Sequence, residues 1–293
     1  MTAAVSPRPL VAAGAASLAV RQPLTGPRRQ ARVIAARSAA VYLELPPPAA
    51  EPRVLVLAAA GTSRLPNAVA VSAGLDRLVA EVSGECWIGR GVVLAGQLTV
   101  RVLRWWDPSP VLGPLSRARL DQGAAALHRA SLSADRVPGL AGHDAPAALA
   151  ASCADGDLAG AVEAAEQMVG LGPGLAPSGD NMISGLLLAL RLLGGAIPGG
   201  TRAVWLADWL GAAVTSDASR RTTSLGATLL YCAAHGQATA EVSAVLRGLA
   251  GQEPLAGATR TLLASTEPAA GADLAWGLVA GCRAALALAL PAR

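Results

Sequence analysis

The apolar runs along this chain constrain its fold most, because their length and spacing change near residue 110. Between Ala31 and Trp106 the Val- and Leu-rich runs are short and are separated by turn residues, as strands are. From about Ser116 onward the runs become long and rich in Ala and Leu, as helices are. Strands followed by helices indicate an α+β fold, with a β-rich N-terminal domain followed by a mostly α-helical C-terminal domain. We expect three parts: an N-terminal segment, partly disordered (1–30), a β-rich domain (31–112) and a helical domain (113–293).

The same patterns predict individual elements. The predicted strands are Arg32–Ile34, Ala40–Leu45, Val54–Leu57, Ala68–Val71, Gly91–Leu94 and Leu98–Leu103. The predicted helices are Leu120–Ser131, Pro146–Cys153, Leu158–Met168, Met182–Leu193, Arg202–Val214, Leu225–Ala234, Ala240–Leu249, Ala258–Leu263 and Asp273–Leu288.

A glycine-rich segment, GLGPGLAPSGDN, lies between two of these helices, at residues 170–181. Its first ten residues hold four glycines and two prolines, which neither a helix nor a central strand tolerates. The segment therefore predicts a loop that ends at a helix N-terminus, where unpaired backbone N–H groups attract anions. We expect Ser178, Gly179, Asp180 and Asn181 to lie there. The structural alternative is that Ser178 is an ordinary N-cap in a tight connection between helices.

Two nucleotide-binding loops are excluded by the residues around this segment. Gly174 and Gly179 have the spacing of a phosphate-binding Walker loop, but Asp180 and Asn181 follow where Lys and Ser or Thr are required. The dinucleotide fingerprint must follow a strand, whereas Leu158–Met168 has a helical pattern.

Two further polar segments lie in the helical half. Residues 216–224 are predicted to form a loop before a helix. The loop contains Arg221, whose guanidinium can bind a carboxylate or phosphate with two hydrogen bonds. A solvated loop with Thr223 or Ser224 as N-cap is the alternative. Residues 266–273 end in Asp273, for which helix capping is favoured over ligand binding.

Composition excludes several classes of partner and cofactor. The net charge of +4 is spread thinly and forms no basic stripe with interleaved aromatic residues, so we expect no nucleic-acid partner. Four cysteines and three histidines lie far apart, so the sequence predicts no metal site. The two longest apolar runs each contain an arginine, so we expect no membrane span and a cytoplasmic location.

The string GLGPGLAPSGDN resembles the hallmark loop of the family that includes the AllH-type subunit of oxamate carbamoyltransferase, usually written GLGPGLTPSGDD. Segments 221–224 and 267–273 fit the same family more loosely. This sequence departs from the family pattern at three places. Ala176 replaces a Thr, Asn181 replaces an Asp, and an Ala pair at 269–270 stands in place of a Ser-Ser-like pair.

The resemblance implies a carbamoyltransferase subunit that binds carbamoyl phosphate, a small amide-carboxylate such as oxamate, or both. It implies a small anionic substrate and other protein subunits or a homo-oligomer as partners, with no cofactor except possible Mg²⁺. The alternatives are a non-catalytic small-anion-binding or regulatory subunit of a larger complex, and a divergent secondary-metabolism enzyme on the same scaffold. The residues expected in catalysis are Asp180, Asn181 and Arg221, and those expected to bind substrate are Gly172, Gly174, Ser178, Gly179, Thr222, Thr223, Ser224 and Asp273.

Overall fold

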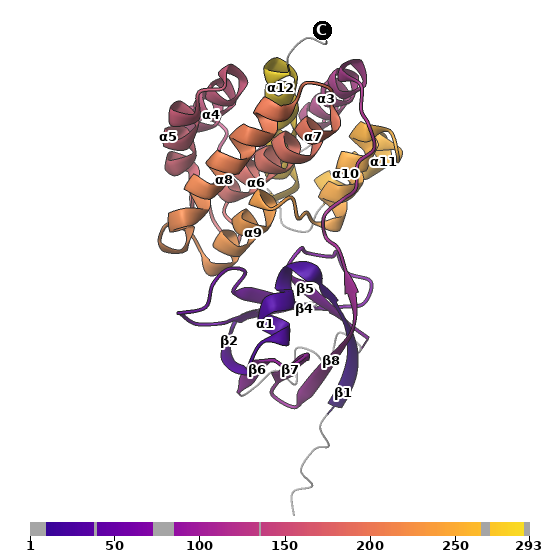
Figure 1. Ribbon diagram of the computed structural model, residues 1–293, viewed down its shortest axis with the longest axis vertical. Coiled ribbons are helices and arrows are strands. Elements are labelled where there is room, and N and C mark those ends of the chain that lie inside the picture. The colour runs from indigo at the N-terminus through magenta and orange to yellow at the C-terminus, as the bar shows by residue number, and fades with distance from the viewer. Residues whose placement is uncertain (1–9, 38–39, 73–84, 135, 265–269, 290–293) are drawn as a thin grey trace, which may run out of the picture. The chain divides into compact units, whose positions relative to one another are not determined.

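The computed structural model describes residues 10–37, 40–72, 85–134, 136–264 and 270–289. The chain divides into two compact units, residues 1–108 and residues 109–293. The first is built from strands and the second from helices, so the predicted α+β class is confirmed (Figure 1).

The described strands of the first unit close into an eight-stranded barrel in the order β1-β5-β4-β3-β2-β6-β7-β8. Most neighbouring pairs are antiparallel, whereas β1 with β8 and β4 with β5 are parallel. The register pairs Val41 with Leu57 and Leu57 with Val69, which sets buried side chains side by side. The strands are β1 (Leu10–Ser17), β2 (Arg29–Arg37), β3 (Ala40–Glu44), β4 (Val54–Ala59), β5 (Ala68–Val71), β6 (Cys86–Gly89), β7 (Val92–Ala95) and β8 (Leu98–Trp106).

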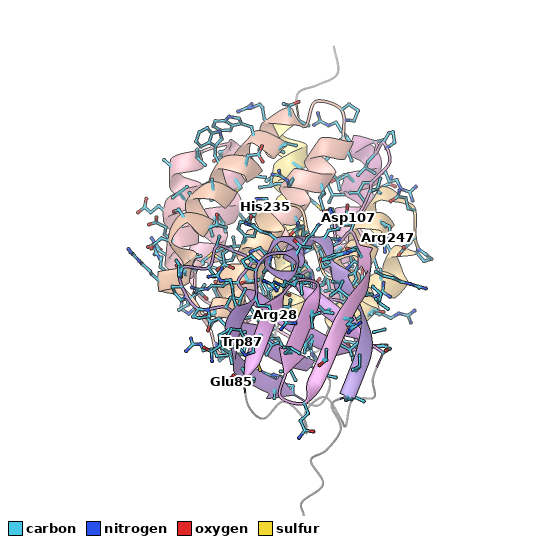
Figure 2. The ribbon with its side chains drawn as sticks, turned by 60° about the horizontal axis from the view of Figure 1, so that its bottom comes forward. Arg28, Glu85, Trp87, Asp107, His235 and Arg247 are labelled. Atoms are coloured by element: carbon cyan, nitrogen blue, oxygen red, sulfur yellow. The ribbon has the colours of Figure 1, made fainter. Side chains whose placement is uncertain are left out.

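Two strands were not predicted, and both depend on partners distant in sequence. β1 lies in the segment expected to be partly disordered, yet it pairs with both β5 and β8 and so closes the barrel. Its residues are small because there is little space inside: a Cβ on Gly14 would lie 2.7 Å from Cγ1 of Val100. β6 is only four residues long, and its Trp87 donates a hydrogen bond to Glu85 at 3.3 Å (both labelled in Figure 2).

The second unit is a helical bundle arranged around α6 (Ser178–Leu188). α6 continues through a turn of π-helix, η2 (Ala189–Leu193), into α7 (Gly194–Ala196). The other helices are α3 (Arg117–Leu132), α4 (Asp144–Asp155), α5 (Leu158–Met168), α8 (Thr201–Arg221), α9 (Ser224–Ala234), α10 (Ala240–Ala250), α11 (Leu255–Leu263) and α12 (Ala270–Leu288). A short helix of the first unit, α1 (Arg21–Thr25), follows β1 after a 3₁₀ turn.

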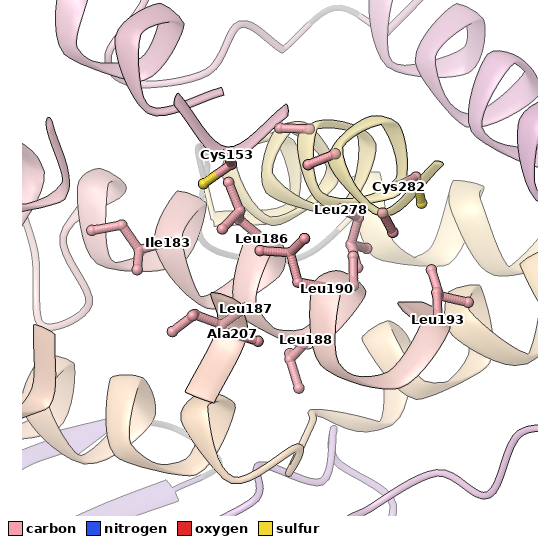
Figure 3. Packing of buried hydrophobic residues seen from close by; sticks show 14 of the residues in the cluster. Cys153, Ile183, Leu186, Leu187, Leu188, Leu190, Leu193, Ala207, Leu278 and Cys282 are labelled. Atoms are coloured by element: carbon pink, nitrogen blue, oxygen red, sulfur yellow. The ribbon is translucent and has the colours of Figure 1, made fainter. Parts of the chain in front are cut away.

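α6 and α12 pack against each other with their backbones close together. A Cβ added to Gly277 would lie 2.8 Å from the backbone nitrogen of Leu186, and one added to Gly281 would lie 2.7 Å from its carbonyl oxygen. Around this contact, Leu186, Leu190 and Leu278 gather in a core built from Leu, Ala and Cys side chains (Figure 3). The glycines therefore allow a helix contact that larger residues would prevent.

α12 is also long and apolar enough to cross a membrane by length and composition alone, with a mean hydropathy of 1.3. However, 72% of its apolar window is buried inside the helical unit, as in the core helix of a soluble protein. The cytoplasmic location stays a prediction.

Candidate functional site

The glycine-rich segment folds back over the end of α5 and leads into α6. The N–H of Leu171 donates to the carbonyl of Met168, and the N–H of Gly179 donates to the carbonyl of Leu171, both at 3.0 Å. Gly172 has a φ of +112° and a Cβ there would lie 2.8 Å from the nitrogen of Ser178, so only glycine fits. Gly172 and Gly174 are exposed, whereas Ser178, at the end of the loop, is buried.

The N-terminus of α6 differs from the expected open anion site. α6 begins at Ser178, and Pro177 rather than Ser178 occupies the N-cap position. Two of the backbone N–H groups expected to point outward are already bonded: that of Gly179 to Leu171, and that of Asn181 to the carbonyl of Pro177. The loop therefore satisfies the Gly179 donor, and the Asn181 donor makes the first regular hydrogen bond of the helix.

Asp180 joins the beginning of the glycine-rich segment to the end of α8. One carboxylate oxygen accepts the N–H of Gly170 at 2.8 Å, and the other accepts the hydroxyl of Thr222 at 2.5 Å. The carboxyl also lies against Gly226 in the first turn of α9, where any Cβ would overlap it. Because both oxygens already have protein partners, Asp180 holds two segments together.

Asn181 and Thr223 hold the middle of the same loop. The Asn181 amide donates to the carbonyl of Ala176 at 3.0 Å. The Thr223 hydroxyl donates to the carbonyl of Leu175 at 2.5 Å and accepts the N–H of Gly226 at 2.9 Å, so Thr223 is the N-cap of α9. Ser224 follows as the first residue of α9 and is half-buried.

Arg221 lies at the end of a helix, not in a loop. The sequence predicted that a loop begins after Val214, but α8 continues to Arg221. The Ser and Thr residues that suggested a loop are accommodated because Thr215 and Ser216 donate to the carbonyls of Gly211 and Ala213 within the helix.

The Arg221 side chain turns toward α5. Its Nη2 donates to the carbonyl of Glu166 at 2.6 Å, and its Nη1 lies 3.6 Å from the Glu166 carboxylate. The Arg221 side chain is 36% exposed, so it remains reachable from solvent. The contact between Glu166 and Arg221 was not predicted. Within a helical segment, no sequence signal shows which acidic residue will contact a side chain of another helix.

Asp273 lies in the first turn of α12 and is fully buried. Its Oδ1 accepts the N–H of Gly139 at 2.8 Å, and the Ser178 side chain interacts with the same carboxyl. Its Oδ2 has no hydrogen-bond partner within the part of the chain that the structure describes. A buried carboxylate oxygen without a donor is costly, so a donor brought to this atom would be stabilising. Part of the third predicted segment, residues 265–269, lies outside the described residues.

The structure therefore brings all three predicted segments together. Thr222 and Thr223 bond to the glycine-rich segment and the start of α6, and Asp273 interacts with Ser178. Gly139 and Gly226 were missed as parts of this cluster. For Gly226 a signal existed, because a glycine in the first turn of a helix is unfavourable unless something packs closely against it.

Burial raises the pKa of both carboxyls above the ordinary value. For Asp180 the Thr222 hydroxyl and the Gly170 N–H oppose this effect, and for Asp273 the Gly139 N–H and the Ser178 side chain oppose it. No group of three or more His, Cys, Asp or Glu side chains is placed to hold a metal ion among the residues described.

These raised pKa values predict how stability depends on pH. From about 3.9, the ordinary pKa of an unfolded Asp, up to the raised folded value, the folded protein binds more protons than the unfolded chain. The free energy of unfolding should therefore fall as pH rises through that window. Asp273→Asn, which cannot ionise, should reduce this fall, as urea unfolding at a series of pH values would measure. Parallel curves for wild type and variant would contradict the assignment to Asp273.

The geometry can now be compared with known proteins. The family model described as oxamate carbamoyltransferase subunit AllH matches residues 168–282, from the end of α5 into α12. Over these residues the helical unit is similar to the AllH family. The match covers less than half of the chain but includes the glycine-rich segment, Arg221–Ser224 and Asp273. No curated protein and no solved structure matches the chain significantly.

This AllH-like match relates the helical unit to a carbamoyltransferase subunit, as the resemblance of the glycine-rich loop predicted. The description of that family as a subunit implies that its members act together with other protein chains. The match does not reach the barrel, whose residues all precede 168.

Proposed function

We propose that the cluster formed by the glycine-rich segment, Arg221–Ser224 and Asp273 is a substrate site of an oxamate-type carbamoyltransferase. Its ligand is carbamoyl phosphate, a small amide-carboxylate such as oxamate, or both. The observation that carries this proposal is the unpartnered, fully buried Oδ2 of Asp273 beside the first turn of α6. The AllH-like match over the same residues supports the reaction class.

The two buried carboxylates take different roles in this proposal. Carbamoyl phosphate and oxamate both carry an NH₂ group, which needs an acceptor inside the site. Asp273 offers one, whereas both oxygens of Asp180 are engaged by Gly170 and Thr222. We therefore assign the NH₂ to Asp273, and treat Asp180 and Asn181 as positioning residues that hold the loop.

Arg221 and the exposed glycines supply the anion-binding groups. A guanidinium has five N–H donors, and Arg221 uses only some of them in its contacts with Glu166. The remaining donors can bind a carboxylate or phosphate. Backbone N–H groups of Gly172 and Gly174, in the exposed part of the loop, complete the set of possible donors.

The transfer step needs no nucleophile from the protein. The amide nitrogen of the acceptor attacks the carbamoyl carbon, so a C–N bond forms while the C–O bond to phosphate breaks. Phosphate leaves with the bonding electron pair, and the amide nitrogen loses one proton. Holding the two substrates together and stabilising the charge that develops on phosphate can supply most of the rate enhancement.

A thermal-shift titration of the full chain tests the site. Carbamoyl phosphate, oxamate, inorganic phosphate, ATP and Mg²⁺ are added separately. A ligand at 100 times its Kd should stabilise the protein by about 2.7 kcal/mol. We expect a shift with carbamoyl phosphate or oxamate that is lost in Arg221→Gln and in Asp273→Asn. Arg129→Gln, on the exposed side of α3, is the matched control and should keep the shift.

Each result changes the proposal in a defined way. A shift that survives in both site variants would place the ligand elsewhere. A shift with phosphate alone would favour the alternative of a non-catalytic anion-binding subunit. The absence of a shift with every ligand would reject a site that is complete in this chain.

A further inference from the structure

Two large aromatic side chains are exposed on one face of α8. Trp205 is 50% exposed and Trp209 is 55% exposed, and their ring centroids lie 6.2 Å apart. Residues four apart in a helix lie on the same face, so the two rings form one continuous surface. We call the surface made by Arg202, Trp205, Trp209 and Ala212 the tryptophan face; α8 crosses the near side of the helical unit in Figure 1.

A hollow borders one end of this face. It has a volume of about 370 Å³ and is lined by Gly156, Thr201, Arg202, Trp205, Leu206 and Leu288. Most of these side chains are apolar, and Leu206 and Leu288 form its buried floor. A single apolar side chain from a partner fits a hollow of this kind, beside an exposed Trp of the type that dominates binding energy at interfaces.

The charge beside the hollow indicates the sign of the charge that the partner segment carries. Arg202 has no carboxylate partner among the described residues, and its guanidinium lies over Gly156. Arg220 lies about five helical turns further along the same edge of α8 and has only a weak contact with Asp217, at 3.9 Å. On the other edge, Asp208 is already paired with Arg191. Within the tryptophan face, the charge without a carboxylate partner among the described residues is therefore the positive charge of Arg202.

This pattern argues against a second copy of the chain on the same face. In a two-fold dimer whose α8 helices run antiparallel, the arginine edge of one copy meets the arginine edge of the other. Where the two helices run parallel, the arginine edge meets the edge that holds Asp208, which is already paired with Arg191. An acidic partner surface does not have this conflict.

We propose that the tryptophan face docks another protein subunit, through a segment that inserts one apolar side chain into the hollow and brings a carboxylate to Arg202. This goes beyond the substrate site, because the tryptophan face contains no residue of that site. The description of the matched family as a subunit supports the existence of such a partner chain.

A photo-cross-linking experiment on the full chain in its native cells tests the proposal. A photoreactive amino acid replaces Ala212, which is exposed and one turn from Trp209. The same replacement at Ala125, exposed on α3, is the control. We expect position 212 to link to a segment of a different protein, sequenced by mass spectrometry, that contains apolar and acidic residues. Trp209→Ala and Arg202→Glu should each lower the yield at least about ten-fold.

Three results would overturn the proposal. They are links from position 212 to a second copy of this chain, links to its own residues 10–106, and a yield no higher than at position 125. An unchanged yield in Arg202→Glu would reject the acidic partner segment. Both substituted side chains are exposed, so we expect both variants to fold. Their melting curves would reveal any loss of cross-linking yield that comes from unfolding.

Discussion

Gly277→Ala is expected to destabilise the helical unit by about 3 kcal/mol, although alanine is the better helix former. The added Cβ would overlap the carbonyl oxygen of Met182 and would lie 2.8 Å from the nitrogen of Leu186. Both neighbours are backbone atoms of α6, so no side chain can rotate away. The two helices would have to move apart, which would open the core between them.

A second glycine provides the matched control. Gly257 lies in α11. Apart from its chain neighbours and the backbone of α11, no heavy atom of the described residues lies within 4 Å of the position that its Cβ would take. Gly257→Ala should therefore stabilise the protein by about 0.5 to 1 kcal/mol, the ordinary gain in helix propensity. Urea unfolding followed by the helical circular dichroism signal measures both variants. Equal midpoints for Gly277→Ala and wild type would show that α6 and α12 are not in close backbone contact.

Asp180→Ala is expected to cost about 3 kcal/mol, because it removes a buried side chain and leaves two partly buried donors without an acceptor. These donors are the N–H of Gly170 and the hydroxyl of Thr222. Asp180→Asn should stay within about 1 kcal/mol of wild type at neutral pH, because the amide can bond to both groups once the hydroxyl rotates. The Asn variant also removes the buried charge, which offsets part of any loss.

The comparison between these two variants separates the structural role of Asp180 from a chemical one. Asp217→Ala is the control. Among the described residues that carboxylate contacts Arg220 at 3.9 Å on the surface, and the loss of this contact should cost less than about 1 kcal/mol. If Asp180→Ala proved as stable as wild type, its contacts with Gly170 and Thr222 would not hold the loop. If Asp180→Asn folded normally but lost carbamoyl transfer, the carboxylate would act in the reaction itself.

Much of this architecture follows from local patterns. Apart from β6, the strands between Ala40 and Leu103 and the helices after Ser116 follow from apolar spacing, because that spacing reflects which side chains share a face of the same element. The glycine-rich loop was predictable for a similar reason, since its glycines and prolines exclude regular structure directly. Helix ends were less certain: α8 runs seven residues past the predicted end, because its Ser and Thr hydroxyls bond within the helix.

The contacts that define the site depend on tertiary structure. Residue types alone marked Asp180, Arg221, Thr222 and Asp273 as candidates. They did not show that Gly170 and Thr222 engage both oxygens of Asp180, or that one oxygen of Asp273 has no partner among the described residues. β1 likewise has a weak strand pattern and is held by β5 and β8. The physical reason is the same in each case. Local sequence determines what a segment can form, whereas burial and hydrogen-bond partners depend on segments that only folding brings together.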